Sequence, residues 1–357
     1  MRMVHDPQFA SPISKTSDWT IELIGLGLFL AAAGWTFLSA FASGGDSIQV
    51  AAMLVAVVSV FWGARVVTGR FSTLVAAMVA VGIASAGVWF RADVFTNRPL
   101  GGPLGYTNAS AALYLQGVVA SLMLFAEARR ALRLAALAAA LAFSAATLLT
   151  GSQAANVLLA LPAIALLGTS RRAAGRVIVV FLGLFLTALA STIVIGATYP
   201  HQGSADGITE VIDTTLSSRR AALWRDALVL TADHPIVGVG PGRFRYESPV
   251  ARSDRDAAWA HNGFLQQGAE GGVPALVLAV SIVVWAFTRL LLAPRPRVAS
   301  LGAASLAALV IHSCIDYLLL FPVLPLTVAA LVGAGVGMGP PSSEGLSSTH
   351  DRRHVRA

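Results

Sequence analysis

Arginine is the side chain with the most evident chemical use in this sequence, because seven arginines fall within one short polar segment. A guanidinium group binds phosphate oxygens through paired N–H donors and keeps its charge at any physiological pH. One interpretation is therefore a surface that binds a diphosphate. The other is a solvated loop whose arginines pair with the neighbouring acids Asp226, Asp233, Glu247, Asp254 and Asp256. The seven arginines are Arg219, Arg220, Arg225, Arg243, Arg245, Arg252 and Arg255.

A histidine follows this segment, where the chain becomes apolar again. On a helix that begins there, Asn262, Gln266 and Glu270 stand at successive i, i+4 positions and form a polar stripe. An imidazole takes or gives a proton near neutral pH, which makes His261 a candidate for acid–base chemistry. The alternative is a histidine whose hydrogen bonds are satisfied by a loop carbonyl.

Two local patterns lie between the first arginines and this histidine. Residues 217–230 place Ala221, Trp224, Ala227 and Leu228 on one helical face, which predicts an amphipathic helix along the membrane surface with Trp224 at the interface. Residues 232–244, with closely spaced Gly and Pro, predict an irregular turn. Its backbone N–H groups could face an anion, although ordinary surface turns use the same residues.

The composition indicates the elements that must position these side chains. Of 357 residues, 56% are hydrophobic and only 12% are charged, and the mean hydropathy is +0.72. These values exclude two ordinary soluble domains and predict an integral membrane protein. The net charge is +7, and every basic residue except Lys15 is Arg. Arginines spread along short loops between apolar segments fit membrane topology better than nucleic-acid binding. The one cysteine, Cys314, excludes an internal disulfide and a cysteine-based metal cluster.

Apolar segments of about 20 residues are long enough to cross the hydrocarbon core of a bilayer. The sequence contains ten candidates and therefore predicts an all-α, polytopic bundle with one large extracytoplasmic loop. Isolated polar residues at or near these spans, Asn156, His312 and Asp316, are expected to make hydrogen bonds between helices. The ten candidates are 20–42, 48–63, 71–90, 109–126, 131–149, 153–168, 177–198, 264–292, 298–313 and 317–337.

The positions of Arg and Lys orient these spans, because positive charges collect in cytoplasmic loops. They predict that both termini are cytoplasmic and that the long loop is outside. The predicted organisation is a cytoplasmic tail (1–19), helices one to seven (20–198), a large outer loop (199–263), helices eight to ten (264–337) and a disordered cytoplasmic tail (338–357).

Three pieces of the outer segment occur in a recognisable order: R-x3-W at 220–224, HP-x-x-GVGPG-x-F at 234–244 and HN-x-x-L at 261–265. Together they resemble the O-antigen ligase family and the related O-antigen polymerases that share its core region. GYTNASAAL at 105–113 and LLTGSQAAN at 148–156 are similar to earlier segments of that family. The resemblance extends over roughly residues 100–280.

This resemblance implies a transferase in the cytoplasmic membrane of a bacterium, acting on its outer face without a metal ion or cofactor. Members move a glycan from a polyprenyl diphosphate carrier to an acceptor hydroxyl. The acceptor is a lipid A core sugar for the ligases and another carrier-linked glycan for the polymerases, and both remain open here. Such an enzyme predicts an outward cavity between the long loop and the bundle.

The resemblance also implies site residues. His261 corresponds to the essential histidine, and Arg220, or with a poorer match Arg219, corresponds to the loop arginine that contacts the diphosphate. Gln153 stands where the family commonly has Arg, so Arg91 or Arg98 could supply the missing charge. The residues expected to bind substrate are Asn262, Arg225, Arg243, Arg245, Gln153, Arg91, Arg98, Asn108 and Glu270.

Two other functions share parts of this pattern. A peptidoglycan polymerase of the SEDS type has the same predicted architecture, but its Ser-Tyr-Gly-Gly-type segment is absent from this sequence. A polysaccharide or lipid transporter would place polar groups near the membrane midplane. Here the ionisable residues gather mainly at the outer rim, which favours the transferase.

Overall fold

The structure, a computed structural model, describes residues 13–70, 74–90, 102–199, 218–253 and 258–337. Arg91, Arg98 and the predicted tail 338–357 lie outside the described residues. Within the described ranges every regular element is a helix. They are α1 (Ile13–Ser43), α2 (Ile48–Arg70), α3 (Leu74–Phe90), α4 (Thr107–Glu127), α5 (Arg130–Leu149), α6 (Gln153–Leu158), α7 (Ala160–Ala165), α8 (Arg171–Thr198), α10 (Ser218–Asp233), α11 (Phe244–Glu247), α12 (Pro249–Ser253), α13 (Gly263–Leu291), α14 (Pro296–Ser313), the 3-10 helix η3 (Leu318–Leu320) and α15 (Val323–Val336).

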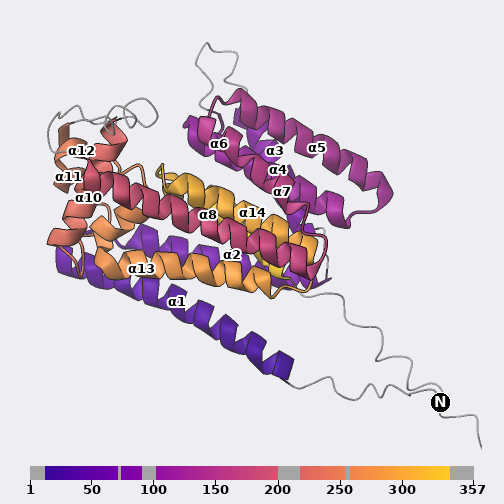
Figure 1. Cartoon of the computed structure of the whole chain (residues 1–357), viewed down its shortest axis with the longest axis horizontal. Coiled ribbons are helices and arrows are strands. Elements are labelled where there is room, and N and C mark those ends of the chain that lie inside the picture. Colours follow the sequence, from indigo (N-terminus) through magenta and orange to yellow (C-terminus); the bar gives the residue numbers. More distant parts are fainter. Residues whose placement is uncertain (1–12, 71–73, 91–101, 200–217, 254–257, 338–357) are drawn as a thin grey trace, which may run out of the picture.

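The long helices pack lengthwise as a bundle (Figure 1). α14 lies at its centre and contacts α4, α8, α13 and α15, while α1 packs along α13 and α2 along α15. The short helices α10, α11 and α12 gather at one end of the bundle, at the left of Figure 1. Nearly all of α14 is buried, as its central place requires.

Six of these helices are long and apolar enough to cross a membrane: α1, α2, α4, α5, α8 and α13. The protein is therefore a multi-pass membrane protein. Helix is present within each of the ten predicted spans. The sixth predicted span is two short helices, α6 and α7, and the tenth contains η3 and α15. The number of ten crossings stays a prediction.

Ion pairs join the helices at the end of the bundle away from α10. Glu22 of α1 contacts Arg65 of α2 at 2.6 Å and Arg289 of α13 at 2.7 Å. Arg295, before α14, contacts Glu127 at the end of α4 at 2.8 Å. By the positive-inside rule the sequence predicts that Arg65, Arg289 and Arg295 are cytoplasmic, and the structure groups these three at one end of the bundle.

Helix α13 is interrupted in its N-terminal half, and the glycine-rich turn (residues 232–244) packs into the interruption. Gly272 has φ +72° and ψ −176°, and Pro274 has no N–H with which to continue the helical hydrogen bonds. The released carbonyl of Glu270 accepts from the backbone N–H of Gly240 at 2.9 Å. The N–H of Val273 donates to the carbonyl of Pro235 at 2.9 Å. The turn is thereby fixed to α13 by backbone hydrogen bonds.

This attachment predicts that Gly272 tolerates no side chain. A Cβ atom there would lie 2.2 Å from the carbonyl oxygen of Ile236, in a backbone conformation that costs a non-glycine residue about 1–3 kcal/mol. We expect Gly272→Ala to lower the thermal unfolding midpoint of the purified protein by several degrees. Gly27→Ala in α1, where a Cβ would meet nothing within 4 Å, is the control. Equal midpoints for the two variants would contradict the attachment.

Candidate active site

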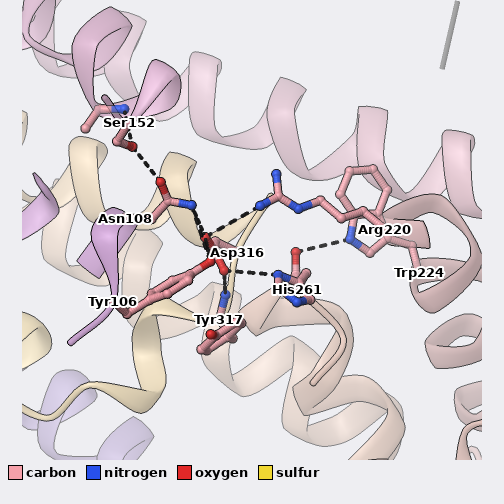
Figure 2. Close-up of polar contacts among 9 residues, drawn as sticks. Tyr106, Asn108, Ser152, Arg220, Trp224, His261, Asp316 and Tyr317 are labelled. Carbon is pink, nitrogen blue, oxygen red and sulfur yellow. Dashed lines mark hydrogen bonds and ion pairs between the residues drawn. The ribbon is translucent and has the colours of Figure 1, made fainter. Parts of the chain in front are cut away.

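A single carboxylate, that of Asp316, collects contacts from parts of the chain that are far apart in sequence (Figure 2). It follows the C-terminal end of α14. Oδ2 accepts hydrogen bonds from Tyr106 Oη at 2.7 Å and from Asn108 Nδ2 at 2.6 Å. On the other side, His261 Nδ1 lies 3.3 Å from Oδ1, and Arg220 Nη2 lies 3.8 Å from Oδ2. We call these five residues the Asp316 cluster.

The electrostatics of the cluster favour the ionised aspartate. Burial by itself raises the pKa of Asp316, but the contacts from His261, Tyr106 and Asn108 and the charge of His261 outweigh burial and lower the pKa to about 2. Burial and the neighbouring carboxylate also raise the pKa of Tyr106, so its hydroxyl remains a hydrogen-bond donor. Asp316 is therefore a fixed negative charge beside one imidazole and one guanidinium.

The backbone of His261 is held in a conformation that few residues adopt. Its φ is +48°, and it is the one residue other than glycine with positive φ in the described part of the chain. The indole Nε1 of Trp224 donates to its carbonyl at 3.1 Å. Outliers of this kind persist only where surrounding contacts over-determine them, and they are frequent at functional sites.

This backbone presents the histidine ring at the surface of the cluster. With Nδ1 directed at Asp316, Nε2 lies on the other side of the ring, and the side chain is 16% exposed. No hydrogen bond to Nε2 is formed within the described residues. The arrangement leaves one ring nitrogen oriented by a carboxylate and the other open to a substrate hydroxyl.

Asn262 explains why α13 begins directly after the histidine. Its Oδ1 accepts from the backbone N–H groups of Phe264 and Leu265, both at 3.0 Å, and so caps the helix. Its Nδ2 donates to Thr192 Oγ1 of α8 at 2.9 Å. Asn262 is fully buried and uses both ends of its amide for the fold. Its structural role is to fix the position of the neighbouring His261.

A small core beneath the cluster holds together the three pieces of outer sequence. Trp224, Phe244 and Leu265 are the large buried residues at the ends of R-x3-W, GVGPG-x-F and HN-x-x-L, and all three belong to one buried cluster. Each exposes 1% or less of its surface. The apolar residues of the three motifs therefore form a common core, and this core positions Arg220 and His261 beside the same carboxylate.

The chain matches the model of the O-antigen ligase family over residues 137–280. We call residues 137–280, which are similar to this family, the O-antigen ligase segment. No curated protein matches the chain. The O-antigen ligase segment runs from α5 into α13 and includes Arg220 and His261. Asp316 lies beyond its end and Tyr106 before its start, so the cluster is completed by residues on both sides of the O-antigen ligase segment.

The segment LLTGSQAAN, at the start of the O-antigen ligase match, also reaches the cluster. Ser152 Oγ donates to Asn108 Oδ1 at 2.7 Å, and Asn108 in turn donates to Asp316. Gln153, the first residue of α6, is exposed next to Ser152. Asn108 is thus in the cluster, where its amide is shared between Ser152 and Asp316, and Gln153 lies at its edge.

The predicted loop arginines of the O-antigen ligase segment separate into different environments. Arg220 is in the cluster, and Arg219 beside it is exposed. Arg225 contacts Asp226 at 3.6 Å, and Arg243 binds both Glu247 Oε1, at 2.7 Å, and the carbonyl of Ser43, at 2.8 Å. Among the six of these arginines that the structure describes, Arg220 is the one placed with His261 in the Asp316 cluster, while Arg225 and Arg243 fit the alternative of local ion pairs. Arg255 lies outside the described residues.

Arg245 and Glu270 lie apart from the Asp316 cluster. The guanidinium of Arg245 stacks over the ring of Tyr246 at 4.6 Å on the exposed surface. Glu270 is buried, and its Oε1 accepts from the backbone N–H of Phe244 at 3.3 Å and from Gln266 Nε2 at 3.1 Å. The acidic group that meets the glycine-rich turn in this structure is therefore the side chain of Glu270.

The sequence-based placement of Trp224 at the membrane surface is wrong. The helix itself exists as α10, and its apolar face is the buried one, since Ala221, Trp224 and Ala227 are all 0% exposed. This face packs against α8 and α13 instead of lipid. The indole of Trp224 is inside the protein, where its N–H donates to the carbonyl of His261.

Asp316, at the centre of the candidate site, is a residue that the sequence does not assign to it. From sequence it is expected only to hydrogen-bond between helices, and it does bond to Asn108 at the start of α4. The sequence does contain a signal for Asp316, because an ionisable residue at a membrane boundary is a functional candidate.

Among the described residues, no group of three or more His, Cys, Asp or Glu side chains is arranged to hold a metal ion.

The depressed pKa of Asp316 predicts a specific loss of stability in acid. The folded-state pKa is about 2, below the ordinary 3.8, so the unfolded chain binds the proton first as the pH falls. The ionised carboxylate stabilises the fold by about 2 kcal/mol above pH ~4, and this is lost as the pH falls to ~2. We expect the difference in thermal midpoint between wild type and Asp316→Asn to narrow over that interval.

Asp233→Asn, which changes an exposed aspartate at the end of α10, is the matched control for this titration. Its midpoint should follow that of the wild type throughout. A gap between wild type and Asp316→Asn that is the same at pH 2 as at pH 7 would contradict the assignment of Asp316 as a fixed charge.

Proposed function

We propose that the protein is a glycosyltransferase that moves a glycan from a polyprenyl diphosphate carrier to an acceptor hydroxyl on the outer face of the bacterial cytoplasmic membrane. The observation that carries this proposal is that His261 and Arg220 meet at one carboxylate, Asp316. The match of residues 137–280 to the O-antigen ligase family model and the multi-pass helices support the same reaction class.

In the proposed reaction the acceptor oxygen attacks the anomeric carbon of the donor glycan. The bond from that carbon to the diphosphate oxygen breaks, and the acceptor proton passes to Nε2 of His261. Asp316, at 3.3 Å from Nδ1, orients the imidazole and stabilises its positive charge after it accepts the proton. The departing diphosphate carries the electron pair of the broken bond.

Arg220 is the residue proposed to receive that negative charge. At 3.8 Å its contact with Asp316 is too long for a hydrogen bond, so the guanidinium keeps donors for a phosphate. Fixed cations placed where charge develops lower the barrier without reorganisation. In this proposal guanidinium groups supply the positive charge, and the mechanism invokes no metal ion.

The orientation of the site follows from the two ends of the bundle. The Asp316 cluster lies at the end opposite Glu22, Arg65 and Arg289, whose arginines the sequence places in the cytoplasm. We therefore place the cluster outside, where a flipped lipid-linked glycan is available. The acceptor is a lipid A core sugar or a second carrier-linked glycan, since each offers the hydroxyl that this chemistry needs.

The first prediction from this mechanism concerns the histidine. We expect His261→Ala to abolish glycan transfer from a radiolabelled lipid-linked donor to acceptor, because the acceptor proton loses its base. His234→Ala changes an exposed histidine of the same outer segment and should leave transfer unchanged. Both variants should insert and fold as the wild type does. Full transfer by His261→Ala would remove the catalytic assignment.

The second prediction separates the two adjacent arginines. We expect Arg220→Ala to lower kcat/KM by about a hundredfold to a thousandfold, the cost of removing a donor aimed at developing charge. Arg219→Ala should cost less than about tenfold, because Arg219 is exposed and outside the cluster. Arg172→Ala, which changes an exposed arginine at the start of α8, is the neutral control. A larger loss for Arg219→Ala than for Arg220→Ala would reverse the assignment.

A further inference from the structure

Four aromatic rings lie together beside the Asp316 cluster: Tyr106, Trp259, Tyr317 and Phe321. Tyr106 and Tyr317 stack at 5.0 Å between ring centroids, and Phe321 lies 5.8 Å from Tyr106 and 5.9 Å from Tyr317. Trp259 lies 6.5 Å from Tyr317 at an interplanar angle of 34°. All four side chains are only partly buried. We call them the aromatic cluster.

The aromatic cluster and the candidate base are in direct contact. The imidazole of His261 meets the ring of Tyr317 edge to face, with the centroids 4.8 Å apart. Tyr317 also follows Asp316 in sequence, and its backbone N–H donates to Asp316 Oδ1 at 2.8 Å. Trp259 precedes His261 by two residues. A ligand on the ring of Tyr317 would therefore lie next to the imidazole of His261.

We propose that Trp259 and Tyr317 form a subsite for a pyranose ring of the acceptor glycan. This inference rests on the proposed function and adds to it the residues that hold the acceptor. A pyranose has an apolar face of C–H groups and a rim of hydroxyls. Flat aromatic rings with a large apolar area match that face, and the polar tips of Tyr and Trp match the rim.

The surroundings favour a sugar over the other apolar ligand available, a prenyl chain. The aromatic cluster is bordered by a polar group that is still partly exposed, the imidazole of His261, which contacts the ring of Tyr317. An isoprenoid placed there would cover this imidazole without giving its Nε2 a hydrogen-bond partner, which is unfavourable. A sugar satisfies both kinds of surface and brings a hydroxyl to His261.

Binding can be measured without the transfer reaction by saturation-transfer difference NMR on the full-length protein in nanodiscs. The probes are methyl β-D-glucopyranoside, methyl α-D-galactopyranoside and methyl α-L-rhamnopyranoside, with sorbitol as a polyol that has hydroxyls but no ring face. We expect saturation of the ring C–H protons of at least one glycoside, and none for sorbitol.

The variants are paired so that a conservative change keeps the ring. Trp259→Ala and Tyr317→Leu should each reduce the saturation of the bound glycoside by about three- to tenfold, as expected for the loss of one aromatic contact. Trp259→Phe and Tyr317→Phe should retain most of it. Trp19→Ala, which removes an exposed tryptophan of α1 far along the chain from the site, should change nothing.

Kinetics supply the second readout. In a transfer assay, Trp259→Ala should raise the KM for the acceptor about tenfold and leave the KM for the lipid-linked donor unchanged. A rise in the donor KM alone would assign the rings to the prenyl carrier and overturn the proposal. Equal saturation in wild type and Trp259→Ala, or no saturation with any glycoside, would overturn it too.

These outcomes are distinguishable from a failure of the proposed function. If His261→Ala transfers glycan at the wild-type rate while the glycosides still saturate through Trp259, the subsite stands and the catalytic role of His261 fails. If His261→Ala abolishes transfer while Trp259→Ala leaves both glycoside binding and the acceptor KM unchanged, the catalytic role of His261 stands and the subsite fails.

Discussion

The structure of the end of the bundle that carries α10 depends on keeping one carboxylate ionised where little water reaches it. A buried charge is tolerated only when hydrogen-bond donors or opposite charges surround it, and the partners of Asp316 come from the start of α4, from the loop before α13 and from α10. These contacts consequently fix the position of each of these elements relative to the end of α14. The requirement that preserves the fold also brings an imidazole and a guanidinium together.

A second constraint fixes the outer loop on the bundle. Helix α13 gives up its hydrogen bonds at Gly272 and Pro274, and the glycine-rich turn uses the released groups. Trp35 of α1 donates to the freed carbonyl of Gly271 at 2.8 Å, so α1 is tied to the same point. The core of Trp224, Phe244 and Leu265 then leaves α10 no freedom to carry Arg220 away from the histidine.

Much of this organisation can be predicted from the sequence because it depends on local pattern. Apolar length predicts the long helices, and the spacing of Ala221, Trp224 and Ala227 predicts the buried face of α10. The resemblance of the ordered motifs to the O-antigen ligase family implies that Arg220 and His261 lie at one site, and the structure places both beside Asp316. Local pattern cannot predict what the apolar face of α10 packs against, because protein and lipid both cover an apolar surface. For that reason the sequence-based placement of Trp224 at the membrane surface is wrong.

The partner of the histidine is beyond local prediction for a different reason. Asp316 is 55 residues from His261 and 96 from Arg220, and only the packing of α14 within the bundle brings them together. Likewise, a glycine-rich turn has the same sequence whether it binds a phosphate or an internal carboxylate such as Glu270. Contacts between residues far apart in sequence decide both the partner of the histidine and the group that the turn binds.

The central claim, that Asp316 and His261 act as one catalytic unit, is tested most directly by a double-mutant cycle on glycan transfer. The rates of His261→Ala, Asp316→Asn and the double variant are compared with that of the wild type in nanodiscs. If the two residues form one unit, the double variant is no slower than the slower single variant, because removing the second member of a broken pair costs nothing more. Independent, multiplying losses would contradict the account.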